Sequence, residues 1–186
     1  MNQTAFDREI TCKQIDLSNK LRELWNEHVL WTRSFIESTA FDLPDLQAVT
    51  DRLLQNPCDF AKLFCRFYGE AKAQQLKKLL KDHLLIAAEL VNALKERNVI
   101  KADKIRCKWY ENAEDIAKFL ASINPYRGKL QWRCLLFDHL RMTEDEAVFI
   151  LRGQYRKGVT IYDEIQNQAM KMADVMTQGL IRQFNI

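Results

Sequence analysis

The sequence contains little glycine and proline, with only five Gly and three Pro among 186 residues. Hairpin turns depend on Gly and Asn-Gly pairs, so this shortage leaves little room for a sheet of short strands. No segment of useful length alternates apolar and polar residues, as a half-buried strand would. These absences favour long helices.

The scarcity of glycine and the arrangement of cysteine also limit the chemistry. The chain has no Gly-x-Gly-x-x-Gly or Walker-type phosphate loop and no Gly-x-Ser-x-Gly elbow. Its five cysteines are an odd number and include no Cys-x-x-Cys pair. We therefore expect buried free thiols in a reducing compartment, the cytoplasm, rather than a disulfide framework or a Cys-rich zinc site. Nothing local marks a nucleophile, so a binding protein is expected rather than an enzyme.

Long apolar runs and charge of one sign are missing as well. The most apolar run, LLIAAELV at 84–91, contains Glu89 and is too short to span a bilayer. The first ten residues lack the basic start and apolar core of a signal peptide. The net charge is only +3, and basic clusters such as Lys77 with Lys78 lie among acids, as on solvated helix faces. Neither a membrane nor a nucleic acid is therefore an expected partner.

The composition that remains, 47% hydrophobic and 28% charged residues, is that of a folded domain. We predict a single all-α domain over 1–186, in which residues 1–15 need not be regular. Apolar spacing predicts a bundle of four long helices, at about 16–38, 70–97, 102–122 and 155–184.

Shorter helical insertions are predicted between these long helices. Two of them, at about 42–56 and 57–69, end at Asn56-Pro57 and at Gly69. Two more, at about 129–141 and 143–153, are separated by a capping-box pattern that starts at Thr143. Their apolar clusters cover the bundle or form a surface for a homo-oligomer. No internal repeat of solenoid period is apparent.

The apolar seam of each long helix is interrupted near its middle by one strongly polar residue. These residues are His28, His83, Asn112 and Gln166, and Tyr162 adds an amphipathic member to the last seam. A bundle would bring them toward a common level, with an offset of about one helical turn between the second and third helices.

Two interpretations of this buried layer stay open. In the first, the polar groups bond one another and fix the helix register of a non-catalytic structural or partner-binding protein. In the second, the bundle core holds a metal or a small ligand. Neutral imidazoles of His28 and His83 would ligate Fe, Mn or Zn, while Asn112, Gln166 and Tyr162 would bond the ligand or orient the histidines.

The remaining candidates for this site are one histidine and two acids. His139 lies in LLFDHL, and each of the three histidines follows an acid and precedes an aliphatic residue. If its helix caps the bundle, His139 becomes a third ligand. Glu27 and Asp163 are the acids best placed to balance a cation. Because bound imidazoles must be neutral, metal affinity is expected to fall as pH drops through about 6.5.

Several segments carry a resemblance to a known family. WNEHVLWTRSFI, QNPCDFAKLFCRFYG, DHLLIAAELV, NAEDIAKFLASINPY and QAMKMADVM resemble a family of uncharacterised small helical proteins from spore-forming and related bacteria. The similarity covers about residues 20–184 and implies a ferritin- or haemerythrin-like bundle. Members are often labelled acetylglutamate kinase, a label that the residues here do not support, because an amino-acid kinase needs a Gly-rich phosphate site on an α/β sheet. The chain also lacks the run of Glu and His ligands of those metal bundles.

Overall fold

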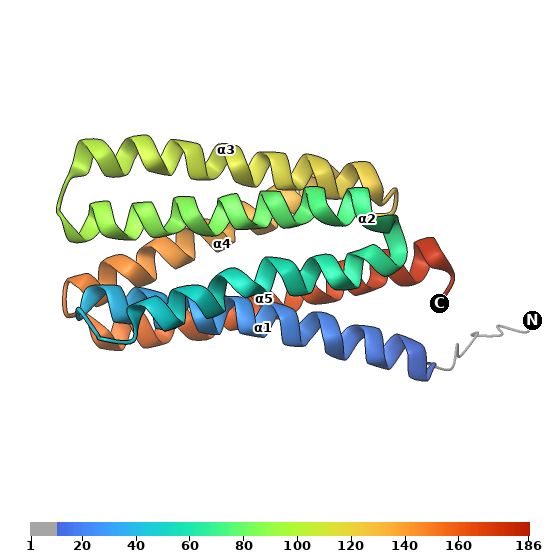
Figure 1. Ribbon diagram of the computed structural model, residues 1–186, viewed down its shortest axis with the longest axis horizontal. Coiled ribbons are helices and arrows are strands. Elements are labelled where there is room, and N and C mark those ends of the chain that lie inside the picture. Colours follow the sequence, from blue (N-terminus) through green and yellow to red (C-terminus); the bar gives the residue numbers. More distant parts are fainter. Residues whose placement is uncertain (1–10) are drawn as a thin grey trace, which may run out of the picture.

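The computed structural model describes residues 11–186, and every regular element in that range is a helix. The helices are α1 (Cys12–Ala40), α2 (Leu46–Lys95), α3 (Val99–Ile123), α4 (Lys129–Leu151) and α5 (Tyr155–Phe184) (Figure 1). The prediction of an all-α chain is confirmed for these residues. None of the five helices is both long enough and apolar enough to cross a membrane.

Gly69 divides α2 into two arms, 46–68 and 70–95. Its backbone has φ 76° and ψ 169°, which is not helical, and the chain turns back on itself there (Figure 1). A Cβ at this position would meet no atom within 4 Å. The backbone conformation, rather than a lack of space, therefore calls for glycine. The described chain thus consists of six helical arms.

The segments predicted as short insertions are instead full-length arms. Residues 46–68 form one arm that continues through Pro57, and α4 continues through Thr143. Leu53 and Phe60, on either side of the proline, are buried, and this burial outweighs the missing backbone hydrogen bond. The Thr143 hydroxyl donates to the carbonyl of His139 at 2.9 Å instead of capping a new helix.

The start of α1 also differs from the prediction. Thr11 caps the helix through a reciprocal pairing with Gln14, so residues 12–15 are helical rather than irregular. The part of that segment before residue 11 lies outside the described residues.

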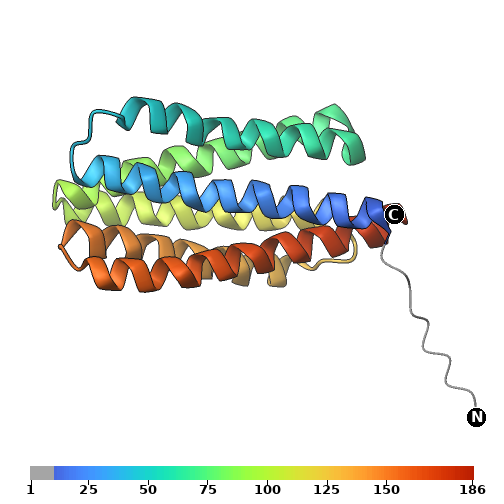
Figure 2. The same cartoon turned by 90° about the horizontal axis from the view of Figure 1, so that it is seen from below.

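The six arms form a closed ring of three helical hairpins. The first hairpin is α1 with the first arm of α2, the second is the second arm of α2 with α3, and the third is α4 with α5. Successive arms run in opposite directions, and α5 packs against α1 to close the ring (Figures 1 and 2). α4 also packs against α1 and α2, so the first arms of the hairpins meet near the centre.

The three hairpins are copies of one another in structure. His28, His83 and His139 occupy the same position in successive hairpins, 55 and 56 residues apart. Six apolar positions of the second arms, 56 residues apart, are buried in all three copies. They are Val49, Ile105 and Ile161; Leu53, Trp109 and Ile165; Pro57, Ala113 and Ala169; Phe60, Ile116 and Met172; Ala61, Ala117 and Ala173; and Phe64, Leu120 and Met176.

The repeat is visible in the sequence over only a short stretch. NPCDFAKLF at 56–64 and NAEDIAKFL at 112–120 share Asn, Asp, Ala and Lys at the same places. Both copies form the same ion pair, Lys62 with Asp59 at 2.9 Å and Lys118 with Asp115 at 3.1 Å. The third copy, QAMKMADVM at 168–176, keeps only the alanine and exchanges the charges. The expectation excluded only a repeat of solenoid period, and this longer period of 55–56 residues was not predicted.

The repeat includes the turn that joins the two arms of each hairpin. Asp42, Arg97 and Gly153 have φ of 52°, 56° and 69°, again 55 and 56 residues apart. In each turn the next residue donates its backbone N–H to a helix carbonyl five residues earlier, at 2.8–3.0 Å. This is the Schellman termination, which usually has glycine at the left-handed position. Only the third copy has it.

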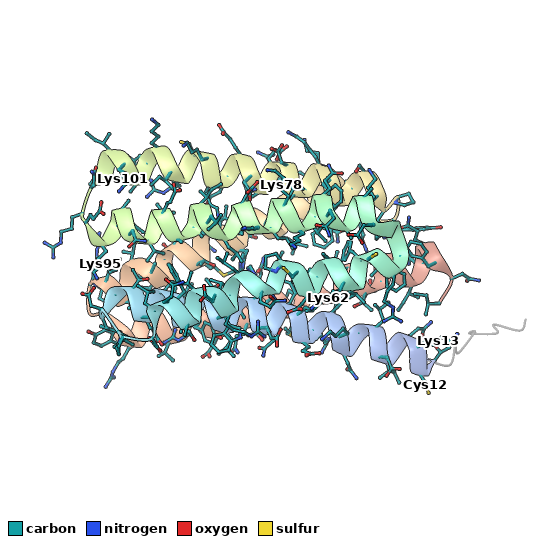
Figure 3. All side chains as sticks on the ribbon, viewed as in Figure 1. Cys12, Lys13, Lys62, Lys78, Lys95 and Lys101 are labelled. Carbon is teal, nitrogen blue, oxygen red and sulfur yellow. The ribbon has the colours of Figure 1, made fainter. Side chains whose placement is uncertain are left out.

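Several cysteines and lysines lie on the outside of the ring. All five cysteines are free, and Cys12, Cys107 and Cys134 are exposed, so the predicted burial of the thiols is wrong for these three. Lys78, labelled in Figure 3, has a side chain that is 77% exposed and pairs with Asp82 at 2.6 Å, as expected of a solvated helix face.

Candidate functional site

The three histidines of the chain meet at the centre of the ring. The ring centroids of His28 and His139 are 5.6 Å apart, and those of His28 and His83 are 6.4 Å apart. All three residues are buried, with exposed fractions of 5%, 3% and 3% for His28, His83 and His139. Each comes from the first arm of its hairpin. The chain therefore places one imidazole from each copy at one level.

An amide side chain from the second arm of the same hairpin holds each of the first two imidazoles. The Nδ1 atom of His28 lies 3.3 Å from Asn56 Oδ1, and that of His83 lies 2.9 Å from Asn112 Oδ1. The predicted offset of a helical turn between His83 and Asn112 is therefore not present. Each amide also donates its NH₂ group to the backbone carbonyl four residues before the histidine, Leu24 at 2.9 Å and Leu79 at 3.2 Å.

These amides fix the tautomer of the two rings. Because each amide nitrogen is bonded to a carbonyl, the amide oxygen is the atom that faces the imidazole. Nδ1 must then carry the hydrogen and donate it, which leaves the lone pair of the neutral ring on Nε2. A histidine that ligates a metal through Nε2 is commonly oriented in this way.

The third copy uses Gln168 in place of asparagine. Its amide nitrogen donates to the carbonyl of Leu135, four residues before His139, as in the other copies. Gln168 lies close enough to His139 to oppose the lowering of its pKa. However, Gln168 Oε1 and His139 Nδ1 are both buried without a hydrogen-bond partner. The longer side chain thus forms the hydrogen bond to the backbone carbonyl and does not form the one to the imidazole.

Burial keeps all three imidazoles neutral. It lowers the pKa of His28 to about 4 and that of His83 to about 3, with the neighbouring His28 adding to the effect on His83. The pKa of His139 falls well below its usual value for the same two reasons. Protons therefore compete for His28 and His83 only at about pH 3–4, and the competition expected from an ordinary imidazole at about pH 6.5 is not supported.

The two acids predicted to join the site do not contact the histidines. Glu27 bonds Arg52 at 2.7 Å on the half-buried rim, and Asp163 is exposed on α5. Among residues 11–186, no three His, Cys, Asp or Glu side chains are arranged to hold a metal ion. In a tetrahedral complex with metal–nitrogen bonds of about 2.0–2.1 Å, imidazole centroids lie about 5 Å apart. The observed 5.6 and 6.4 Å are wider, so the rings would have to approach.

Gln166 and Tyr162 belong to a different polar cluster. Tyr162 is half-buried beneath the guanidinium of Arg33, 4.8 Å from the ring centre. Burial raises the pKa of Tyr162, and its hydroxyl has no hydrogen-bond partner within residues 11–186. Gln166, one turn further along α5, lies close enough to oppose the rise in pKa. Arg33 also bonds Glu146 at 2.5 Å. Glu146 is only 1% exposed, and burial raises its pKa to about 7, opposed by the charge of Arg33.

The amide that faces the histidine layer from α5 is Gln168, two residues beyond the predicted Gln166. Val159, seven residues before Gln166, is 53% exposed, whereas Ile161, seven residues before Gln168, and Ile165 face the core. Asn56 was missed because Asn-Pro was interpreted as a helix stop. The 56-residue spacing of Asn56, Asn112 and Gln168, matched to the acid-His-aliphatic triplets, is the signal that identifies both.

A small cavity lies one helical turn beyond the histidine layer. It lies among residues four positions after each histidine, Thr32, Ala87 and Thr143, and has a volume of about 20 Å³. Leu53 and Trp109 contribute to its mostly apolar lining. This volume accommodates roughly one water-sized molecule. The three small side chains thus leave a space one helical turn beyond the imidazoles, and none of the three histidines lines it.

Comparison of the chain with protein-family models, curated proteins and solved structures gave no match.

Proposed function

We propose that the protein binds one transition-metal ion on His28, His83 and His139. One observation carries the proposal: three neutral imidazoles, one from each hairpin, converge at the centre of the ring. Two of them present Nε2 as the free lone pair because asparagines hold Nδ1. The lowered pKa values mean that no proton has to leave the rings at neutral pH.

The ligand set favours zinc or iron. Imidazole nitrogen suits Zn and Fe, whereas Mn prefers the carboxylate and carbonyl oxygens that this layer lacks. Glu27 and Asp163 have no role as ligands in this proposal. A divalent charge buried without a carboxylate is costly, so the fourth position would take hydroxide or another small anion.

The alternative is a purely structural layer. It is favoured by the same hydrogen bonds, because Asn56 and Asn112 already satisfy Nδ1 of their histidines and tie together the two arms of a hairpin. Partner binding through the extra helices has less support, since Phe60, Leu63 and Phe64 are buried within the ring.

Metal content and metal-dependent stability distinguish the two functions. Protein purified without an affinity tag is expected to contain zinc or iron at about one ion per chain. After chelation, adding Zn²⁺ or Fe²⁺ anaerobically is expected to raise Tm, because an ion that binds only the folded state stabilises it. The His83→Ala variant should lose this rise.

A neighbouring aromatic ring provides the matched control. Trp109 is buried with its ring centroid 5.4 Å from that of His83, but it offers no metal ligand. The Trp109→Phe variant should lower Tm and still show the rise on adding metal. If wild-type Tm does not respond to Zn²⁺ or Fe²⁺ and no stoichiometric metal is found, the metal proposal fails and the structural layer remains.

A further inference from the structure

The end of the ring that carries the three Schellman turns has a wide recess. It is a half-open bowl of about 720 Å³. Ala40, Lys95 and Leu151, which are equivalent residues of the three hairpins, all line it. The bowl therefore lies where the central axis of the ring leaves the molecule. Lys95 and Lys101 are at this end in Figure 3.

The lining of the bowl combines apolar side chains with unpaired positive charge. Val99, Val148 and Leu151 supply apolar surface, and Arg97 and Arg152 are the arginines of the lining. The third cation, Lys95, is already bonded to Asp42 and to the carbonyl of Thr39. Neither arginine side chain forms a hydrogen bond or an ion pair within residues 11–186. Two guanidinium groups are thus free to bind an anion.

Arg97 lies at a position where the backbone conformation favours glycine. It has φ 56° at the left-handed position of the second turn, where the third hairpin has Gly153. An L-residue with a side chain is strained in this conformation, and glycine is not. The turn itself therefore gains nothing from arginine. What arginine adds there is a guanidinium at the bowl.

We infer that this bowl binds a small amphipathic anion, a carboxylate or phosphate that carries a short apolar chain. The planar guanidinium groups of Arg97 and Arg152 match the oxygens of either head group. Val99, which is 69% exposed, and its apolar neighbours would cover the chain. The volume lies in the range of small-molecule sites, which pair apolar surface with a few polar groups. This site is separate from the histidine layer and does not depend on a metal.

Calorimetric titration of the full chain with octanoate and octyl phosphate, below their micelle concentrations, tests the inference. We expect at least one of the two to bind once per chain, and the tighter one identifies the head group. Octanol, which has the chain without the charge, and inorganic phosphate, which has the charge without the chain, should each bind at least tenfold more weakly. Equal binding of octanol and octanoate, with no binding of octyl phosphate, would overturn the inference.

Substitution of Arg97 separates binding from folding. Arg97→Gly should weaken binding of the chosen probe about tenfold while raising Tm by about 2–4 °C, because it relieves the strained turn. Arg152→Gln should weaken binding similarly. Arg156→Gln removes the same charge at the same end, from a residue outside the lining, and should leave affinity within twofold. If Arg156→Gln weakens binding as much as Arg97→Gly does, the bowl is not the site.

Discussion

Two polar layers of the core, two helical turns apart, differ in how closely they follow the threefold repeat. In the first layer the three equivalent positions all hold histidine, and two of them bond an asparagine of their own hairpin. In the layer seven residues further on, the equivalent positions hold Phe35, Leu90 and Glu146. Glu146 is bonded by Arg33, which belongs to a different hairpin. Two of the three repeated histidines are thus satisfied by a repeated local partner, whereas the single Glu146 pairs with a charged residue from another hairpin.

Burial changes the pKa values of the titratable groups in the two layers in opposite directions. It lowers the pKa of the histidines and raises that of Glu146, since both environments favour the neutral form. Between about pH 4.5 and 6.5, the histidines therefore bind fewer protons in the folded chain than in the unfolded chain, and Glu146 binds more. Measurements of stability at different pH values, and substitutions of the residues that pair with these groups, test this contrast.

The largest expected effect is loss of stability in acid. Between pH 6.5 and about 4 the unfolded chain binds protons on His28 and His83 that the folded chain does not, so the free energy of unfolding falls as pH falls. Each fully buried ring contributes roughly 3 kcal/mol over this window. Urea unfolding of metal-free protein at a series of pH values measures the slope.

Glu146 should oppose this loss. Its contribution is present below the unfolded pKa of about 4.5 and is lost as pH rises through about 7, the opposite slope. Glu146→Gln is therefore expected to steepen the fall in stability between pH 6.5 and 4.5. A pH profile that the substitution leaves unchanged would mean that Glu146 titrates normally.

A smaller but still large effect is expected from removing the ion pair of the second layer. Arg33→Met removes the cation beside Glu146 and leaves a buried carboxyl without its partner, which should cost about 3 kcal/mol at pH 8. Adding Glu146→Leu restores the apolar character of Phe35 and Leu90 and should recover most of that loss. Urea midpoints of both variants measure the difference, and a double variant no more stable than Arg33→Met would contradict the explanation.

The smallest effect should come from making the three hairpins more alike at the histidine layer. Gln168→Asn gives the third hairpin the amide of the other two and lets its oxygen accept from His139 Nδ1. One recovered buried hydrogen bond stabilises by about 1 kcal/mol. The Nδ1 proton of His139 should become observable by NMR, and Tm should rise. A fall in Tm would show that the longer side chain fits its place better than asparagine does.

The sequence predicts the helices well because their apolar spacing is long and regular. It also places His28, His83 and Asn112 in one layer, since each interrupts a seam near its middle. It is least reliable where a local signal competes with packing. Pro57 and Thr143 indicate helix ends, yet buried apolar residues on both sides extend the helix through each of them.

The complete site could not be predicted because it depends on the alignment of the three copies. Outside a few positions the hairpins share burial rather than identity, and the first hairpin is one residue shorter than the other two between its turn and its second arm. Gln168 is recognised as a member of the layer only when it is compared with Asn56 and Asn112. Arg33 and Glu146 lie 113 residues apart, so their ion pair follows from the closed ring and not from local spacing.

The contact of α5 with α1 gives the protein a property that an open array of repeats lacks. In an open array the first and last repeats each have one bare side and unfold more easily than the middle ones. Here every hairpin has a neighbour on both sides, and the ion pair of Arg22 with Asp174, at 2.7 Å, joins the last helix to the first. No hairpin is terminal. Slow amide hydrogens should therefore exchange through one opening of the whole ring, at similar rates in all three copies.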